Sequence, residues 1–258
     1  MLTQGEINHF DTFGFLVHRQ AFDVAETEAL RAEFEAVCTR LLGHAPGAGD
    51  VVWEQPFVEL SPLLSRMVED DRVYGPTQDL LGEGMLWAGS EGMWGFDTLA
   101  DHPWHADGGW VPEQETTHRL KVMIYLDAQR RDTGALRIIP GSHRSALHES
   151  LLPFADVADD DDPRYCGVRG TEVPCHAIET DPGDIVFFNN WLFHAVYGKV
   201  HPRRCIVLKF MEAPSSESHS AEIREQEGIH MVHESFTGSD SPRIRGLVSR
   251  LREAYEVG

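Results

Sequence analysis

Hydrophobic residues divide the chain into a mostly helical beginning (residues 1–84), a strand-rich middle (85–212) and a helical end (213–258). In the beginning, four apolar residues recur at helical spacing: Leu30, Phe34, Val37 and Leu41. Asp23 before them is a favourable N-cap and Gly43 after them a favourable stop, so we expect one long helix between the two.

Shorter signals surround that helix. Thr3-x-x-Glu6 is a capping-box pattern that opens a helix. GFLVHRQAF (14–22) has the composition of a strand, and Ser61-Pro62 places an N-cap before a proline in a first helical turn. At the other end, Ser241-Pro242 opens a last helix whose apolar residues share one face: Ile244, Leu247, Val248 and Leu251.

The middle of the chain consists of short strand-like runs separated by turn residues. The runs are MLWAGSEGMW (85–94), THRLKVMIYLD (117–127), ALRIIPG (135–141), GDIVFFNN (183–190) and CIVLKF (205–210). Short strands of this kind are typical of a sandwich or barrel. Residues 153–172 include ADDDDPRYCG, which we interpret as a solvated acidic insertion. We therefore expect a single mainly-β domain over residues 1–258, with helices supplied from both ends.

Composition narrows the range of partners. The chain has 258 residues, 41% of them hydrophobic, and a net charge of −20, which disfavours nucleic acid and anionic lipid as partners. No apolar run is long enough to span a membrane, and the N-terminus lacks the pattern of a secretory signal. The four cysteines form no CxxC motif, so we expect reduced thiols and a cytoplasmic protein, although a Cys166–Cys175 bridge remains open. The oligomeric state is not indicated.

The stretch PWHADGGW (103–110) is the first candidate site. Side chains two apart in a strand point to the same face, so His105 and Asp107 can bind one ion together. Gly108 and Gly109 then leave room beside it. Two imidazoles and one carboxylate on one face of a metal are the ligands of the non-haem iron(II) oxygenases. A His-x-Asp pair also arises by chance, as in His9-Phe10-Asp11, so the pair needs a partner.

A later histidine is the candidate for that partner. His194 follows the apolar run of TDPGDIVFFNNWLFHAV, and Arg203-Arg204 open the next strand. A guanidinium at the base of a barrel is a suitable bidentate partner for a carboxylate such as that of 2-oxoglutarate.

With these motifs in order, the sequence resembles the phytanoyl-CoA dioxygenase-like family of iron(II)- and 2-oxoglutarate-dependent oxygenases. The resemblance rests on LTQGEINHFDTFGFLV at the start, PWHADGG, KVMIYLDAQRRDTGALRIIPGSHR (121–144) and the run into His194. It implies a double-stranded β-helix, or jelly-roll, core. It also implies a dioxygenase that consumes 2-oxoglutarate and O₂, with ascorbate as a reductant in vitro.

The resemblance also assigns roles to residues. It implies that His105, Asp107 and His194 bind iron(II) and that Arg203 holds 2-oxoglutarate. Met123 and Trp87 are expected to line the cosubstrate pocket, and Trp110 to contact substrate at the mouth of the barrel.

Two departures from the family pattern leave alternatives open. The segment between His194 and Arg203 is about two residues shorter than usual, and Val196 stands where a serine often assists the cosubstrate. Arg204 is therefore a second candidate for the anchor. Arg203 is preferred because the family motif aligns there, and because alternation puts Arg204 on the same face as the apolar Ile206, a face that can pack on helices.

We expect hydroxylation of a C–H bond in a small metabolite or natural-product intermediate. Asp107 argues against halogenation, which in related enzymes needs a small residue at that position. An acyl-CoA substrate is disfavoured by the charge of −20 and the lack of a Lys/Arg cluster, which favour a neutral or cationic substrate. The alternatives are a non-catalytic jelly-roll binding or sensing protein and an iron oxygenase that does not use 2-oxoglutarate.

Overall fold

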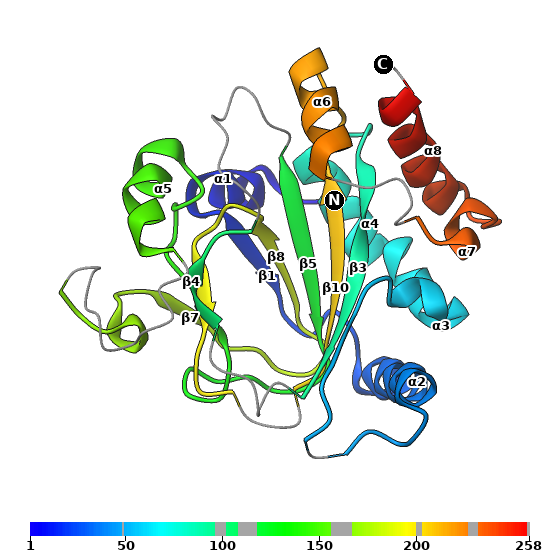
Figure 1. The fold of residues 1–258 in the computed structure, drawn as a ribbon, viewed down its shortest axis with the longest axis horizontal. Helices are drawn as coiled ribbons and strands as arrows, with labels where there is room; N and C mark the ends of the chain where they lie inside the picture. Colours follow the sequence, from blue (N-terminus) through cyan, green and yellow to red (C-terminus); the bar gives the residue numbers. More distant parts are fainter. Residues whose placement is uncertain are drawn as a thin grey trace.

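A computed structural model describes residues 1–47, 49–95, 102–107, 118–155, 167–199, 203–226 and 232–256. The strands among them form two antiparallel sheets (Figure 1). The major sheet has the order β1 (Phe15–His18), β8 (Ile185–Asn189), β5 (Arg119–Tyr125), β10 (Cys205–Met211), β3 (Leu86–Trp94) and β2 (Val52–Glu54). The minor sheet has the order β4 (His102–His105), β9 (His194–Val196), β6 (Leu136–Ile138) and β7 (His176–Ile178). Two facing antiparallel sheets agree with the jelly-roll fold expected from the sequence.

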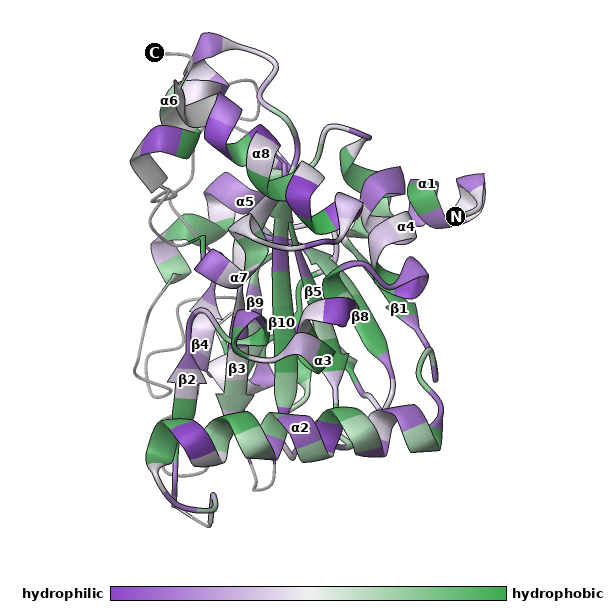
Figure 2. Cartoon of the chain, turned by 90° about the vertical axis from the view of Figure 1, so that its right-hand side faces the viewer, coloured by the Kyte–Doolittle hydropathy of each residue, from purple (hydrophilic) through white to green (hydrophobic). Residues whose placement is uncertain are grey.

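Helices come from both ends of the chain, as expected. Those of the beginning are α1 (Gln4–Phe13), α2 (Val24–Leu42), α3 (Pro62–Ser65) and α4 (Asp71–Leu81). The helix α5 (Ser145–Leu151) lies within the middle part, and α6 (Glu217–Gln226), α7 (Glu234–Thr237) and α8 (Pro242–Glu256) follow the last strand. Figure 2 shows α2, α3 and α8 in front of the major sheet. Within the described residues, no helix is both long and apolar enough to cross a membrane.

Local signals set the ends of the helices. Thr3 and Asp23 each form a capping box, with Glu6 and Glu26 respectively. Gly43 ends α2 in the left-handed conformation, which glycine adopts without strain. The expected buried face of α2 is nearly right, since Leu30, Phe34 and Val37 are buried, but Leu41 is 41% exposed. The run 14–22 is also shorter than expected, since only Phe15–His18 pair with β8.

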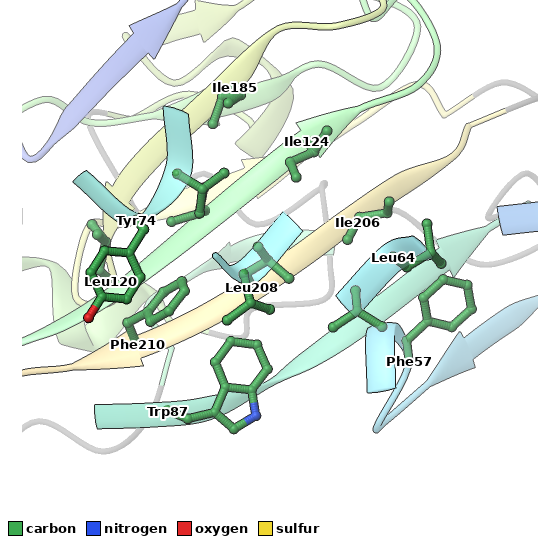
Figure 3. Packing of buried hydrophobic residues seen from close by; sticks show 14 of the residues in the cluster. Phe57, Leu64, Tyr74, Trp87, Leu120, Ile124, Ile185, Ile206, Leu208 and Phe210 are labelled. Carbon is green, nitrogen blue, oxygen red and sulfur yellow. The ribbon is translucent and has the colours of Figure 1, made fainter. Parts of the chain in front are cut away.

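Alternation along the strands of the major sheet separates two cores. In β5, Leu120, Val122 and Ile124 pack towards the helices, whereas Met123 and Tyr125 point between the sheets. Strand β10 alternates in the same way. Figure 3 shows the helix-facing side, where labelled side chains of β5, β8 and β10 lie beside Leu64 of α3 and Tyr74 of α4. The inner face is the one that carries polar residues, and it is there that a cavity opens.

Candidate metal centre and its cavity

Two histidines from adjacent strands of the minor sheet face each other. His105, at the end of β4, pairs directly with His194, at the start of β9, and their ring centroids lie 4.3 Å apart. Asp107 follows just past the end of β4. Its backbone N–H donates to the Asn190 carbonyl (3.0 Å), and the Asn190 side-chain amide donates to the Asp107 carbonyl (3.1 Å). These bonds fix the carboxylate beside the two imidazoles.

The three side chains have the geometry of a metal site. One potential ligand atom from each of His105, Asp107 and His194 lies within 4.8 Å of the others. The Nδ1 atoms of His105 and His194 lie 2.8 Å from the carbonyls of Pro103 and Leu192, two residues before each histidine. When Nδ1 donates a hydrogen bond to a carbonyl, Nε2 carries the lone pair that a metal binds. The donor set therefore fits a divalent cation.

Electrostatics keep two of these ligands in the form that binds metal. Burial lowers the pKa of His194 to about 4, although nearby Asp107 opposes this, so the imidazole is neutral at neutral pH. Burial raises the pKa of Asp107, but the adjacent Lys121 ammonium, together with the two nearby imidazoles, outweighs it and holds the pKa at about 2. Lys121 Nζ lies 2.8 Å from Asp107 Oδ2, and that oxygen lies 3.6 Å from His194 Nε2. The carboxylate is thus ionised and attracts a cation.

A cavity of about 110 Å³ opens from this cluster into the space between the sheets. Its apolar walls include Met123, Leu136, Phe188, Val196 and Val207. Its polar lining includes Trp53, Glu91, His102, Lys121 and Arg203 in addition to the three clustered residues.

Arg203 is the most unusual member of this lining. Its side chain is buried, with 2% of the residue exposed, and Nε donates to the carbonyl of Gly134 (3.2 Å). Among the described residues, no carboxylate pairs with its guanidinium. A buried charge without a partner is strongly unfavourable, so this position fits an anionic ligand.

Gly134 makes room for that guanidinium. Its φ is +95°, and a Cβ added there would lie 3.3 Å from Arg203 Nε and 3.2 Å from Gln129 Oε1. Glycine is therefore required twice, for the backbone conformation and for the close approach.

Arg204 and Trp87 are not in the cavity, which corrects the expectation that they contribute to cosubstrate binding. Arg204 points to the helix side of the sheet, where its guanidinium binds both carboxylate oxygens of Asp127 and also pairs with Glu35 of α2. The Trp87 side chain lies in the core between sheet and helices, and its Nε1 donates to Glu59 (3.1 Å). Both follow from strand alternation, which turns neighbouring residues to opposite faces.

The other candidates fall as follows. Met123 lines the cavity, as does Val196 at the position where a serine was expected. Trp110 lies outside the described residues. His9 packs against Phe13 and Phe15, away from the cluster, as expected for a chance pair.

Sequence reasoning missed three residues of the site. Trp53 lies on β2, in a part of the chain that was expected to be helical, and Glu91 on β3 faces inwards beside it. Lys121 was quoted only as part of a strand. A charged residue inside an otherwise apolar alternating run was the available signal for Glu91 and Lys121.

Comparisons with known proteins agree with this geometry. The family model described as Phytanoyl-CoA dioxygenase (PhyH) matches residues 10–199. An ectoine dioxygenase of Halomonas elongata is 28% identical over 162 residues, which cover 55% of this chain and 46% of the relative. A 2-aminoethylphosphonate dioxygenase of an uncultured bacterium is 22% identical over 124 residues, covering 48% and 44%. The chain thus matches about half the length of these curated relatives.

Solved structures share the fold. HygX from Streptomyces hygroscopicus, with nickel and 2-oxoglutarate bound, aligns with a TM-score of 0.65 and 20% identity over 82% of this chain and 88% of that one. EctD from S. alaskensis, in its apo form, aligns with a TM-score of 0.58 and 20% identity over 82% and 78%. At this identity the likeness establishes the fold.

Proposed function

The chain belongs to the phytanoyl-CoA dioxygenase (PhyH) family, and on that premise we propose that it is an iron(II)- and 2-oxoglutarate-dependent dioxygenase acting on a small molecule. The observation that carries the proposal is the meeting of two features in one cavity. One part of the cavity lining is the cluster of two histidines and an aspartate. Another part is the buried Arg203, which has no carboxylate partner among the described residues.

In this proposal His105, Asp107 and His194 hold iron(II). Three protein ligands on one side leave the remaining positions for cosubstrate and O₂. Iron(II) bound there would supply activation of O₂, with 2-oxoglutarate oxidised to succinate and CO₂ and one oxygen atom left for the substrate. The contribution of the chain is to orient these components and to exclude water.

Arg203 holds the distal carboxylate of 2-oxoglutarate. Its Nε is already engaged by Gly134, which orients the guanidinium and leaves its terminal nitrogens for a bidentate pair. Met123, Val196 and Val207 would contact the carbon chain between the two ends of the cosubstrate. The described elements would then act together as one oxygenase domain.

For the outcome on the substrate, we propose hydroxylation of a C–H bond. The carboxylate of Asp107 fills the position that a halide needs in halogenating relatives. The intact ligand set and the arginine also favour an enzyme over a binding protein, which has no need of all four residues. Names of relatives such as ectoine dioxygenase support a small polar metabolite as substrate.

The test is the release of succinate from 2-oxoglutarate by protein supplied with iron(II), ascorbate and O₂, with and without a panel of small metabolites. The proposal requires succinate that depends on iron, and a metabolite that increases it. Iron binding with no consumption of 2-oxoglutarate under any condition would instead favour an oxygenase that does not use this cosubstrate. Failure to bind iron would favour the non-catalytic binding protein.

A further inference from the structure

A second cavity, of about 300 Å³, adjoins the metal cavity. The two have four lining residues in common: Trp53, Glu91, Asp107 and Lys121. The second cavity extends along β5 and β10 and is also lined by Arg119, Asn190 and Lys209. Lys121 and Asp107 therefore stand at the boundary between the candidate metal site and a larger polar space.

Two lysines of this boundary are directly opposite each other. Lys121 of β5 pairs in register with Lys209 of β10, an arrangement that is unfavourable unless each charge is compensated. Each has its own carboxylate. Lys209 Nζ lies 2.5 Å from Glu91 Oε1, and Lys121 Nζ lies 2.8 Å from Asp107 Oδ2.

The two carboxylates are not equivalent. Glu91 is fully engaged within the protein, because Trp53 Nε1 (3.2 Å) and Gln55 Nε2 (2.9 Å) also donate to it. The partner of Lys121 is instead one of the candidate metal ligands. The oxygen of Asp107 that contacts Lys121 is the one nearest to His194 Nε2.

A divalent cation bound by His105, Asp107 and His194 would compensate the negative charge of the Asp107 carboxylate. It would also repel an ammonium group so close to it, since the interaction of charges is strong in a site with little water. Lys121 would then lose the one carboxylate that it contacts among the described residues, while its Nζ stays at the edge of the second cavity. Glu91 would still be paired with Lys209, so among the described residues of that lining it could not compensate Lys121.

We propose that the second cavity is the substrate site, and that the substrate carries an oxyanion, a carboxylate or a phosphonate, which binds Lys121. This deepens the proposed function and rests on it. Anchoring at Lys121 holds the adjoining carbon beside the metal, because Lys121 contacts a metal ligand directly. The indole of Trp53, 53% exposed, borders the carbon skeleton at the outer rim. The charge of −20 over the whole chain pointed to a neutral or cationic substrate, but the local charges of this cavity favour an anion.

The experiment uses protein loaded with manganese(II), which accepts the same ligands as iron(II) and speeds the NMR relaxation of nearby protons. With 2-oxoglutarate saturating, so that the Arg203 position is filled, three probes of similar size are added: butyrate, propylphosphonate and uncharged butyramide. We expect relaxation of one or both anions and not of butyramide. The more strongly bound anion identifies the oxyanion.

Variants assign the effect to the lysine. Lys121→Met should weaken binding of the anion by at least ~10-fold, whereas Lys121→Arg should retain this binding. Arg40→Gln, which removes a charge on the exposed side of α2, should leave the binding unchanged. If butyramide protons were relaxed as much as those of the anions, the inference would be overturned and the proposed function would stand. The same holds if neither anion were relaxed while 2-oxoglutarate was. A Lys121→Met variant that loses affinity for 2-oxoglutarate or for manganese instead would assign Lys121 to the cosubstrate or to Asp107, and would also overturn it. No relaxation of 2-oxoglutarate itself in the wild type would contradict the proposed function.

Discussion

Two consecutive arginines on opposite faces of one strand should have separable effects on cosubstrate affinity and on stability. Arg203 faces the cavity without a carboxylate partner among the described residues, and Arg204 is bound to Asp127 and Glu35 on the helix side. We therefore expect Arg203→Gln to weaken the binding of 2-oxoglutarate and Arg204→Gln to lower the stability of the fold.

The magnitudes follow from these contacts. A charge-assisted pair to a partly desolvated carboxylate contributes about 1.5–3 kcal/mol, so Arg203→Gln should raise the Kd of 2-oxoglutarate by about 10- to 150-fold. It removes a buried charge that pairs with no carboxylate of the described residues, so stability without cosubstrate should stay the same or rise. Arg204→Gln leaves Asp127 buried. Breaking a buried pair costs about 3–5 kcal/mol, and we expect the lower end because Arg31 Nε remains 3.9 Å from Asp127. The Glu35 side chain is 43% exposed and should add little.

The assays are calorimetric titration of 2-oxoglutarate into metal-loaded protein and urea unfolding of the metal-free protein, on wild type and both variants. If Arg204→Gln lost the cosubstrate and Arg203→Gln lost stability, the side-chain directions described for this strand would be wrong. Unchanged 2-oxoglutarate affinity in both variants would remove Arg203 from the proposed site.

Gly134→Ala should raise the Kd of 2-oxoglutarate and destabilise the fold by about 1–3 kcal/mol, because it strains a positive φ and places a Cβ 3.3 Å from Arg203 Nε. Gly43→Ala, with φ +78° and no neighbour within 4 Å, is the matched control and should lower stability without affecting the cosubstrate; equal effects of both on affinity would contradict the role of Gly134. The metal-free protein should lose stability as pH falls from about 7 to about 4. In the unfolded chain His102 and His194 take up protons near pH 6.5, whereas burial in the fold lowers the pKa of each to about 4, so the unfolded state binds more protons in this window. Urea unfolding across this pH range measures the loss of stability. A free energy of unfolding that rose on acidification would refute the lowered pKa values of these two histidines.

The parts of the fold that the sequence predicted well are those with a clear period. Alternation along the strand that became β10 correctly separated Cys205 and Val207 from Ile206, Leu208 and Phe210, and so placed Arg203 and Arg204 on opposite faces. Capping residues such as Asp23 located the helix ends, because they satisfy backbone groups that a helix leaves free.

What the sequence could not predict depends on contacts between distant segments. β2 has only three residues, too few for a period, and it is a strand because it pairs with β3. This pairing is what brings Trp53 to the cavity. Lys121 faces Asp107 because β4 and β9 lie across the sandwich from β5, and no local pattern contains that information.

The most direct measurement of the central claim is anaerobic binding of iron(II), followed by the visible absorption that appears when 2-oxoglutarate chelates the metal. We predict stoichiometric iron and this absorption in the wild type and in His9→Ala, whose imidazole packs against Phe13 and Phe15 instead. Iron should be lost or greatly weakened in His105→Ala, Asp107→Ala and His194→Ala. A His105→Ala protein that retained both stoichiometric iron and the absorption would contradict the metal centre described here.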